Sequence, residues 1–438
     1  LFAHDDAQFG TGGDESIIKC GSYTSTSGGD PHEVNVGFEP QWVMIKNTGS
    51  SSAYAPWIMF DNMRGIYAGD TPSSSYGHDP ALSANYTYEE GTTYNYNANL
   101  IDITPTGFKT FPSNTPVNVD TGNYIYMAIR RPNKPPETAT EVFGLSTQSG
   151  SPYPTFTSGF PVDFFINRNG MSNAGNDNYI GSRLTGKEIL KSNTMGERVG
   201  YGDIGWDYMT GFGEESNTVS DNYAYMFKRA PGFMDVVNYV GNGSVRTLNH
   251  NLGVIPELII TKSRSNTQQW GVSSSLFPNP TGDFLYLQAS DEIDNFSNNL
   301  FKTATNTTYG YGTASPNDGR YNRSYYTYVS YLFATLSGIS KVSTYSGTGN
   351  AINVDCGFTN GARFILIKRT NGSGKWYVWD TLRGISSGND SYFTLNQDAA
   401  QVTNTDFIDP LSAGFTVTSS APAALNTSGG TYLFLAIA

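Results

Sequence analysis

Cysteine is scarce in this chain. Cys20 and Cys356 are the only two among 438 residues, which is too few for a disulfide framework. Free cysteines are among the most buried residue types in proteins. We therefore expect both side chains to be buried or half-buried thiols.

Charged residues are also few, and the acidic ones predominate. Asp, Glu, Lys and Arg together make up 15% of the chain, and the formal net charge is −12. A nucleic-acid-binding protein needs a concentrated basic surface, and the sequence has none, so we expect no nucleic-acid partner. No apolar run approaches the ~18 residues of a membrane span, and we expect no membrane insertion.

Residue patterns typical of catalysis are missing as well. The four histidines form no metal-binding spacing, and no Cys-x-x-Cys occurs. No histidine stands in the context of a serine nucleophile. Adjacent carboxylates at 88–91 and 213–216 are the pairs to test for glycoside hydrolysis, although we favour solvated, exposed loops as the explanation. We expect no catalytic residues and no cofactor.

Calcium is the one metal that the sequence leaves open. Oxygen-bearing side chains cluster at 175–178 and 290–299, and Ca²⁺ is bound by such ligands. Neither stretch matches an EF-hand loop, and turns rich in Asn and Asp are common in β proteins. The sequence therefore predicts no dedicated metal ligand.

Glycine and aromatic residues, in contrast, are abundant. The chain has 48 Gly, 29 Tyr and 25 Phe, and Tyr, Phe, Val, Ile and Thr alternate with clusters of Gly, Asn and Ser. This composition is typical of many short strands joined by turns. Residues 184–193 form the only stretch that resembles a short helix. We predict an all-β protein.

One phrase occurs twice in the chain. Residues 42–66 read WVMIKNTGSSSAYAPWIMFDNMRGI, and residues 364–385 read FILIKRTNGSGKWYVWDTLRGI. Segments before and after the phrase also match in order, and two weaker copies lie between them. The sequence therefore predicts four units of about 100 residues. With an N-terminal segment, the expected parts are 1–16, 17–130, 138–229, 233–335 and 336–438.

Within a unit the pattern indicates antiparallel strands. The runs at 43–46 and 365–368 are short and apolar, as in a strand buried on both faces. Turns with Asn and Gly follow, and an aromatic strand returns. A hairpin with three or four further strands fits a β-sandwich or jelly roll, so we predict tandem units of that type. The pattern does not specify the order of the strands.

The repeated phrase also contains candidate binding residues. In each copy a Trp begins the returning strand and an Asp-x-x-Arg pair ends it. The residues are Trp57, Asp61, Arg64, Trp376, Asp380 and Arg383. Such a group resembles a sugar-binding platform. Alternatively, the Asp caps a turn and the Arg holds the loop by hydrogen bonds. We favour the structural alternative, because the middle copies lack the motif and keep the unit.

Tyrosine-rich segments at 76–100 and 321–331 are the most distinctive surface candidates. Tyr, Asn, Ser and Arg at high density are typical of recognition surfaces. The same tyrosines are equally suited to stacking across a sheet or a subunit interface. Both interpretations concern contact rather than chemistry.

The phrase at 42–66, with GSYT at 21–24 before it and YIYMAIR at 124–130 after it, resembles an uncharacterised repeat domain. That domain is found in large virion proteins of tailed bacteriophages, especially marine ones such as cyanophages. The resemblance covers all four units in outline and is specific in the first and last. It implies a virion-surface role, as a tail fibre, spike or capsid-attached component.

From the resemblance and the composition we expect a non-enzymatic structural protein of the virion surface, outside the cell. Its partners would be further copies of itself, other virion proteins and a host cell-surface glycan. The alternatives are a secreted or tailspike protein that binds or depolymerises polysaccharide, and a bacterial surface adhesin. A convincing pair of acid and base carboxylates would favour the enzyme, and the sequence shows none.

Overall fold

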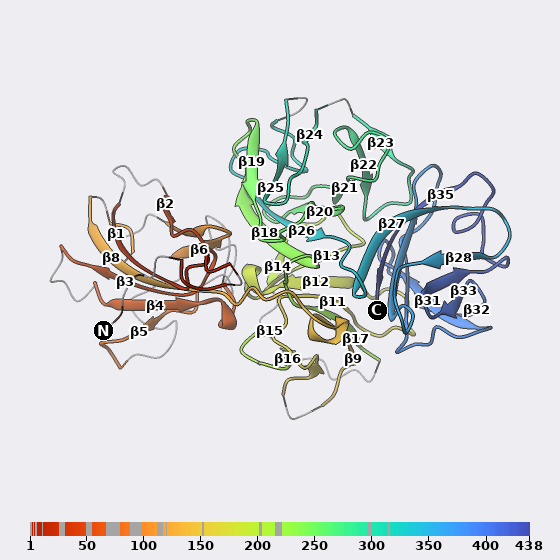
Figure 1. Cartoon of the computed structure of the whole chain (residues 1–438), viewed down its shortest axis with the longest axis horizontal. Coiled ribbons are helices and arrows are strands. Elements are labelled where there is room, and N and C mark those ends of the chain that lie inside the picture. The colour runs from red at the N-terminus through yellow and green to blue at the C-terminus, as the bar shows by residue number, and fades with distance from the viewer. Residues whose placement is uncertain are drawn as a thin grey trace. The chain divides into compact units, whose positions relative to one another are not determined.

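The computed structural model of the protein describes the chain apart from residues 1, 3, 5–6, 11, 26–30, 50–54, 67–78, 88–98, 112–116, 120, 151–152, 201–203, 215–220, 297–298 and 314–315. The fold is all-β, as the composition predicts (Figure 1). In the described part, no helix is long and apolar enough to cross a membrane. Both cysteines are free, Cys20 half-buried and Cys356 buried, which confirms that prediction.

The strands fall into four successive sets, here called repeats 1 to 4. Repeat 1 contains β1 (Ile18–Thr24), β2 (His32–Asn35), β3 (Pro40–Asn47), β4 (Trp57–Asp61), β5 (Leu82–Ser83), β6 (Ile101–Thr104), β7 (Gly107–Thr110) and β8 (Asn123–Arg130). Repeat 2 contains β9 (Phe143–Thr147), β10 (Phe156–Thr157), β11 (Phe164–Arg168), β12 (Asn178–Ser182), β13 (Glu188–Lys191), β14 (Val199–Gly200), β15 (Ile204–Gly205), β16 (Gly211–Glu214) and β17 (Tyr223–Phe227).

Repeats 3 and 4 each have nine strands among the described residues. Repeat 3 contains β18 (Met234–Val240), β19 (Arg246–Asn249), β20 (Leu258–Ser263), β21 (Gly271–Ser274), β22 (Asp283–Tyr286), β23 (Asp294–Asn295), β24 (Phe301–Lys302), β25 (Thr308–Tyr311) and β26 (Thr327–Phe333). Repeat 4 contains β27 (Ser340–Ser346), β28 (Ile352–Asp355), β29 (Phe364–Arg369), β30 (Tyr377–Asp380), β31 (Asp390–Thr394), β32 (Val402–Thr405), β33 (Ile408–Leu411), β34 (Gly414–Val417) and β35 (Thr431–Ile437).

Each repeat combines one large and one small antiparallel sheet. The large sheets have the orders β1-β8-β3-β4-β5, β9-β17-β11-β12-β13-β14, β18-β26-β20-β21-β22-β23 and β27-β35-β29-β30-β31-β32. The small sheets have the orders β2-β7-β6, β10-β16-β15, β19-β25-β24 and β28-β34-β33. In every repeat the last strand lies between the first and the third. This shared topology confirms the prediction of tandem β-sandwich units.

The runs at 43–46 and 365–368 were both predicted to be buried on two faces, and the prediction is right for the second run only. Met44 and Lys46 of β3 are half-buried, whereas residues 365–368 of β29 are all buried. Ile365 and Ile367 point into the sandwich of repeat 4 and join a core with Phe415 of the small sheet. Phe364 points to the opposite face, where its ring packs 5.5 Å from that of Phe143 in repeat 2. The continuous apolar run therefore contributes side chains to two cores, one within repeat 4 and one between repeats.

The stretch at 184–193 was expected to be helical, and this prediction is wrong. A single 3₁₀ turn, η4 (Arg183–Thr185), ends at Gly186, whose φ of 61° suits glycine. The chain then enters β13, where Ile189 and Leu190 are buried. Burial of these two side chains in a sheet outweighs the weak helical propensity of the stretch.

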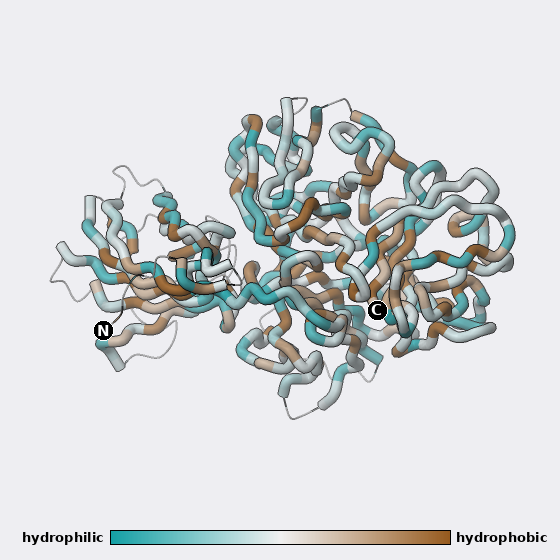
Figure 2. Tube along the Cα trace, in the orientation of Figure 1, coloured by the Kyte–Doolittle hydropathy of each residue, from teal (hydrophilic) through white to brown (hydrophobic). Residues whose placement is uncertain are grey.

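The chain divides into two compact units. Unit 1 comprises Leu1–Asn133, Gly181–Ile189 and Val199–Tyr208, and unit 2 comprises Lys134–Ile180, Leu190–Arg198 and Met209–Ala438. Repeat 1 thus belongs to unit 1, and repeats 3 and 4 belong to unit 2 with most of repeat 2. Figure 2 shows that short hydrophobic and hydrophilic stretches alternate along the chain of unit 2.

In unit 2 the large sheets of three repeats pack against one another through aromatic rings. Phe164 of repeat 2 lies 4.5 Å from Tyr331 of repeat 3, measured between ring centroids. Phe227 of repeat 2 contacts both Phe333 of repeat 3 and Phe364 of repeat 4, at 6.0 and 6.3 Å. The outer faces of these sheets therefore form a second, shared core.

Candidate functional site

The Asp-x-x-Arg motif of repeat 4 closes the turn that follows β30. Asp380 Oδ1 accepts a hydrogen bond from the backbone N–H of Arg383 at 2.9 Å, and Oδ2 accepts from Arg383 Nε at 2.5 Å. Arg383 Nη2 donates to the carbonyl of Val378 at 3.0 Å. Both charged side chains are almost completely buried, and Tyr225 Oη also donates to Asp380 Oδ2 at 2.8 Å.

The same motif in repeat 1 has the same geometry in a more open setting. Asp61 caps the 3₁₀ turn η1 (Asn62–Arg64), where its Oδ1 accepts from Arg64 N at 3.1 Å. Arg64 Nε donates to Asp61 Oδ2 at 2.8 Å. Both side chains are half-buried. In both copies the guanidinium and the carboxylate bond to each other, and this geometry is the one expected of a turn cap.

The two middle repeats keep the cap without the charge. Ser182 occupies the capping position of η4, and its Oγ accepts from Leu184 N at 3.3 Å. In repeat 3, Ser274 Oγ accepts from Leu276 N at 3.1 Å. A hydroxyl oxygen replaces the carboxylate in the same role, because either can satisfy an exposed N–H at the start of a turn. All four repeats therefore use this position to begin a turn.

A basic residue occupies one place in the third strand of every large sheet. Its position is defined by its partner on the last strand of the repeat. The four pairs are Lys46 with Ile125, Arg168 with Tyr223, Lys262 with Val329, and Lys368 with Leu433. Lys46 is half-buried, whereas the three cations of unit 2 are fully buried.

The three buried cations donate to main-chain carbonyls of another repeat. Lys262 Nζ of repeat 3 lies 3.2 Å from the carbonyl oxygen of Met195 in repeat 2. Lys368 Nζ of repeat 4 lies 2.7 Å from that of Asp291 in repeat 3. Arg168 Nη2 of repeat 2 lies 2.6 Å from that of Ala399 in repeat 4. In each case the acceptor belongs to the loop after the fifth strand, and the three contacts close a ring.

A second donor accompanies each cation. This donor lies directly before the fourth strand or at its first residue. Its side-chain N–H donates a hydrogen bond to the carbonyl of the last residue of the fifth strand in the neighbouring repeat. The donors and acceptors are Trp270 Nε1 to Lys191 (3.0 Å), Trp376 Nε1 to Tyr286 (2.9 Å) and Asn178 Nδ2 to Thr394 (3.2 Å). The three interfaces of unit 2 therefore have the same construction.

Main-chain hydrogen bonds repeat with the same threefold pattern. The carbonyl four residues after the fifth strand accepts from a backbone N–H of the neighbouring repeat. The pairs are Gln268 N to Met195 O (3.0 Å), Gly374 N to Ser290 O (2.9 Å) and Gly175 N to Asp398 O (2.8 Å). Repeats 2, 3 and 4 thus form a closed three-membered ring, in which each repeat donates to one neighbour and accepts from the other (Figure 1).

Burial governs the electrostatics of these interfaces. It lowers the pKa of Lys262 to about 7, against the opposing influence of Glu197. It lowers the pKa of Lys368 to about 8, where Asp291 and Glu292 oppose it. The pKa of the Arg168 guanidinium is lowered for the same reason. The low polarity that shifts these values also strengthens each hydrogen bond that the cations donate.

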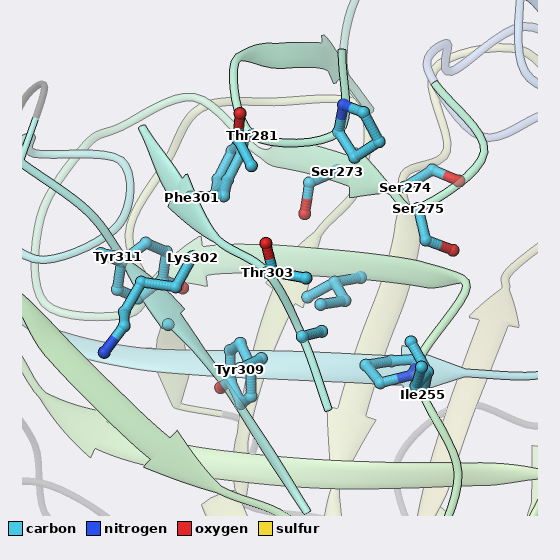
Figure 3. A pocket seen from close by; sticks show the side chains of 15 residues that line it. Ile255, Ser273, Ser274, Ser275, Thr281, Phe301, Lys302, Thr303, Tyr309 and Tyr311 are labelled. Carbon is cyan, nitrogen blue, oxygen red and sulfur yellow. The ribbon is translucent and has the colours of Figure 1, made fainter. Parts of the chain in front are cut away.

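Repeat 3 also contains a cavity of about 360 Å³ between its two sheets (Figure 3). Phe301 and Tyr309 line it from the small sheet, and Ser273 from the large sheet. Ser273 stands opposite Ile259 in the register, where Trp379 of repeat 4 stands opposite Ile365. The cavity exists because a small hydroxyl side chain replaces a large inward-facing aromatic one.

The candidate binding residues are thus divided among different environments. Asp380, Arg383 and Trp376 are buried within unit 2, and the Trp376 indole belongs to an interface between repeats. Asp61, Arg64 and Trp57 of unit 1 are half-buried.

The structure describes only part of the other sequence candidates. Residues 88–91 and 215–216 of the two carboxylate pairs lie outside the described residues, as do most of residues 76–100. In the second tyrosine-rich segment, Tyr328 stacks on Tyr239 at 5.1 Å, whereas Tyr325 is exposed. The described residues contain no group of three or more His, Cys, Asp or Glu side chains that is placed to hold a metal ion.

The repeated cation is the feature that sequence reasoning missed. The Ile-Lys that ends the strand at 45–46 and 367–368 was visible, and repeats 2 and 3 have Arg168 and Lys262 in its place. A lysine at the end of a strand is usually solvated, so the pattern alone did not suggest that it joins repeats.

Comparison with protein families gives a match over most of the chain. Residues 15–132 and 172–438 match the family described as a domain of unknown function, DUF7483. The matched residues include repeat 1, most of repeat 2 and the whole of repeats 3 and 4. No curated protein matches the chain.

Proposed function

The chain belongs to the family described as domain of unknown function DUF7483. We propose that it is a non-enzymatic structural protein of the surface of a tailed-phage virion. It acts as a fibre, spike or capsid-attached component and contributes to assembly and attachment to the host. The observation that carries the proposal is the use of the repeated cations. Arg168, Lys262 and Lys368 are buried and donate to main-chain carbonyls of a neighbouring repeat.

This arrangement supports a mechanical role. A catalytic cation has to reach a substrate, whereas these three side chains are buried and donate to main-chain carbonyls of the same chain. Three similar interfaces hold each repeat of the ring on two sides, and such an arrangement suits a part that must remain folded outside the cell. The resemblance of the phrase at 42–66 to virion repeat domains supports the location.

Attachment requires a surface that recognises the host, and the cavity of repeat 3 favours a glycan as partner. Its lining combines the rings of Tyr309 and Tyr311 with hydroxyl groups of Ser273 and Thr303 (Figure 3). Aromatic faces and hydroxyl donors are the groups that hold sugars, and the volume is within the range of small-ligand sites. Polysaccharide binding or depolymerisation is therefore the second candidate function.

Immunogold electron microscopy tests the location. An antibody to this chain is applied to particles from the producing culture, and we expect gold on the particles. Label at the tail tip supports host recognition, and label over the head supports a capsid component. Bare particles with labelled cells or free filaments contradict the proposal. Incubation with host polysaccharide tests the second candidate, since release of reducing ends requires an enzyme.

A further inference from the structure

Repeat 1 carries the same interface groups as the three repeats of the ring. Lys46 occupies the cation position, and Trp57 pairs with it across the sheet, where the second donor stands in repeats 3 and 4. Ser83 ends the fifth strand and pairs with Ile58, as Thr394 of repeat 4 pairs with Tyr377. All the donor and acceptor positions of one ring member are therefore present.

The acceptor loop of repeat 1 also has the local geometry of the ring. Ala84 N donates to the carbonyl of Trp57 at 3.0 Å, as Leu395 N donates to that of Trp376 at 3.0 Å. A side-chain amide then accepts from the backbone N–H of the second donor in every repeat. The four pairs are Trp57 N to Asn85, Asn178 N to Asn193, Trp270 N to Gln288 and Trp376 N to Asn396.

The outer face of the large sheet is apolar in repeat 1, as it is in repeats 3 and 4, but only in repeat 1 is it exposed. Ile125, which pairs with Lys46, is 41% exposed, whereas its counterparts Val329 and Leu433 are 0% and 2% exposed. Leu82 is exposed, and its counterparts Leu285 and Phe393 are buried. The next row of this face contains Met44, Met59 and Met127 across three strands. Methionine suits such a contact surface, because its side chain adapts to irregular neighbours.

The internal ring identifies the partner of this face. Each repeat of the ring donates hydrogen bonds to one neighbour and accepts them from the other. Three successive contacts of this kind return to the first repeat, so the ring closes at three. Repeats 2, 3 and 4 fill those three places within one chain. A head-to-tail contact whose rotation closes at three generates a threefold ring from identical units as well. The partner that fits repeat 1 is therefore repeat 1 of another copy.

We propose that three copies of this chain assemble through repeat 1 into a threefold ring of the same design. Lys46 of one copy donates to the carbonyl of Thr87 in the next, and the Trp57 indole N–H donates to the carbonyl of Ser83. Thr87 stands four residues after Ser83, as Ser290 stands after Tyr286. Lys46 Nζ also donates to the carbonyl of Ala55 in its own chain, and an ammonium group has further donors for a second acceptor.

Analytical ultracentrifugation of the full chain tests this assembly. We expect a species of three times the 47.6 kDa mass of one chain. Ile125→Glu places a charge on this face beside Lys46, and we expect it to shift the protein to the monomer. The matched control is Val402→Glu, because Val402 is also 41% exposed and lies on an edge strand of repeat 4. This control should remain trimeric.

A milder variant keeps the test independent of folding. Trp57→Phe retains the ring and removes the indole N–H, and we expect it to raise the midpoint concentration of trimer dissociation about tenfold or more. Circular dichroism and the melting temperature should match those of the wild-type monomer fraction. A wild-type chain that is monomeric or forms another oligomer, or a trimer that persists in Ile125→Glu, overturns the proposal. These outcomes do not depend on the location of the protein on a virion.

Discussion

Lys368 Nζ lies 2.7 Å from the carbonyl oxygen of Asp291, a residue of the preceding repeat. The same amine is fully buried and also donates to the carbonyl of Arg369 at 2.7 Å. One side chain thereby joins the end of its own strand to a loop of the neighbouring sandwich. The equivalent contacts of Arg168 and Lys262 give unit 2 three such links.

The first prediction concerns this link. Lys368→Met keeps the length and the apolar stem of the side chain but removes the hydrogen bonds that the buried amine donates to the carbonyls of Asp291 and Arg369. We expect the free energy of unfolding of unit 2 to fall by about 1–3 kcal/mol, the usual contribution of hydrogen bonds from a charged group. Urea unfolding measures the change. Lys134→Met is the control, because Lys134 is exposed, and it should leave the unfolding midpoint unchanged. Equal behaviour of the two variants would show that the link is dispensable.

The second prediction compares the two copies of the Asp-x-x-Arg motif. Asp380→Asn leaves the buried guanidinium of Arg383 without its counter-ion, and we expect a loss of about 3–5 kcal/mol. Asp61→Asn makes the same change in a half-buried pair, where water replaces part of the interaction, and about 1 kcal/mol or less is expected. Thermal unfolding of the two variants provides the comparison. The interpretation fails if Asp61→Asn is the more damaging of the two.

The third prediction concerns pH. The pKa of Lys262 is about 7 in the folded chain, below its ordinary value of 10.5. Between these values the unfolded chain holds a proton that the folded chain lacks, so raising the pH stabilises the folded state. Relative to Lys262→Met, the wild type should gain on the order of 3 kcal/mol between pH 7 and pH 9.5. Urea unfolding of both proteins at the two pH values measures this difference, and parallel profiles would refute it.

The fourth prediction concerns the cavity of repeat 3. Phe60 of repeat 1 and Trp379 of repeat 4 occupy the position of Ser273 and are fully buried. Ser273→Phe should therefore fill the cavity and raise the free energy of unfolding by about 1 kcal/mol through added apolar burial. Calorimetry measures the shift. Thr307→Phe, at an exposed site of the same repeat, should give none.

A small ligand provides a second measure of the same cavity. Indole corresponds to the side chain that Trp379 places in repeat 4, so millimolar indole should raise the melting temperature of the wild type. The rise should disappear in Ser273→Phe, because the ring then occupies the space. A rise that survives the substitution would mean that indole binds elsewhere.

Local sequence patterns were sufficient to predict the fold class and the repeats. Three local features supported these predictions: the alternation of apolar residues, the turn residues around 47–49 and 370–373, and the duplicated phrase. Each depends only on residues that are close together in the sequence. The same reasoning failed at 184–193, where propensity is weak and burial of Ile189 and Leu190 selects a strand. The capping role of Asp380 was among the alternatives because a turn cap is also a local feature.

The sequence by itself determined an all-β chain of four related sandwiches with a repeated Asp-x-x-Arg turn. Only the tertiary structure decided the strand order, the closure of repeats 2 to 4 into a ring and the burial of Arg168, Lys262 and Lys368. The physical reason is distance along the chain. Lys368 and Asp291 are brought together by the packing of two whole sandwiches, and no periodicity of residues near either one encodes that contact.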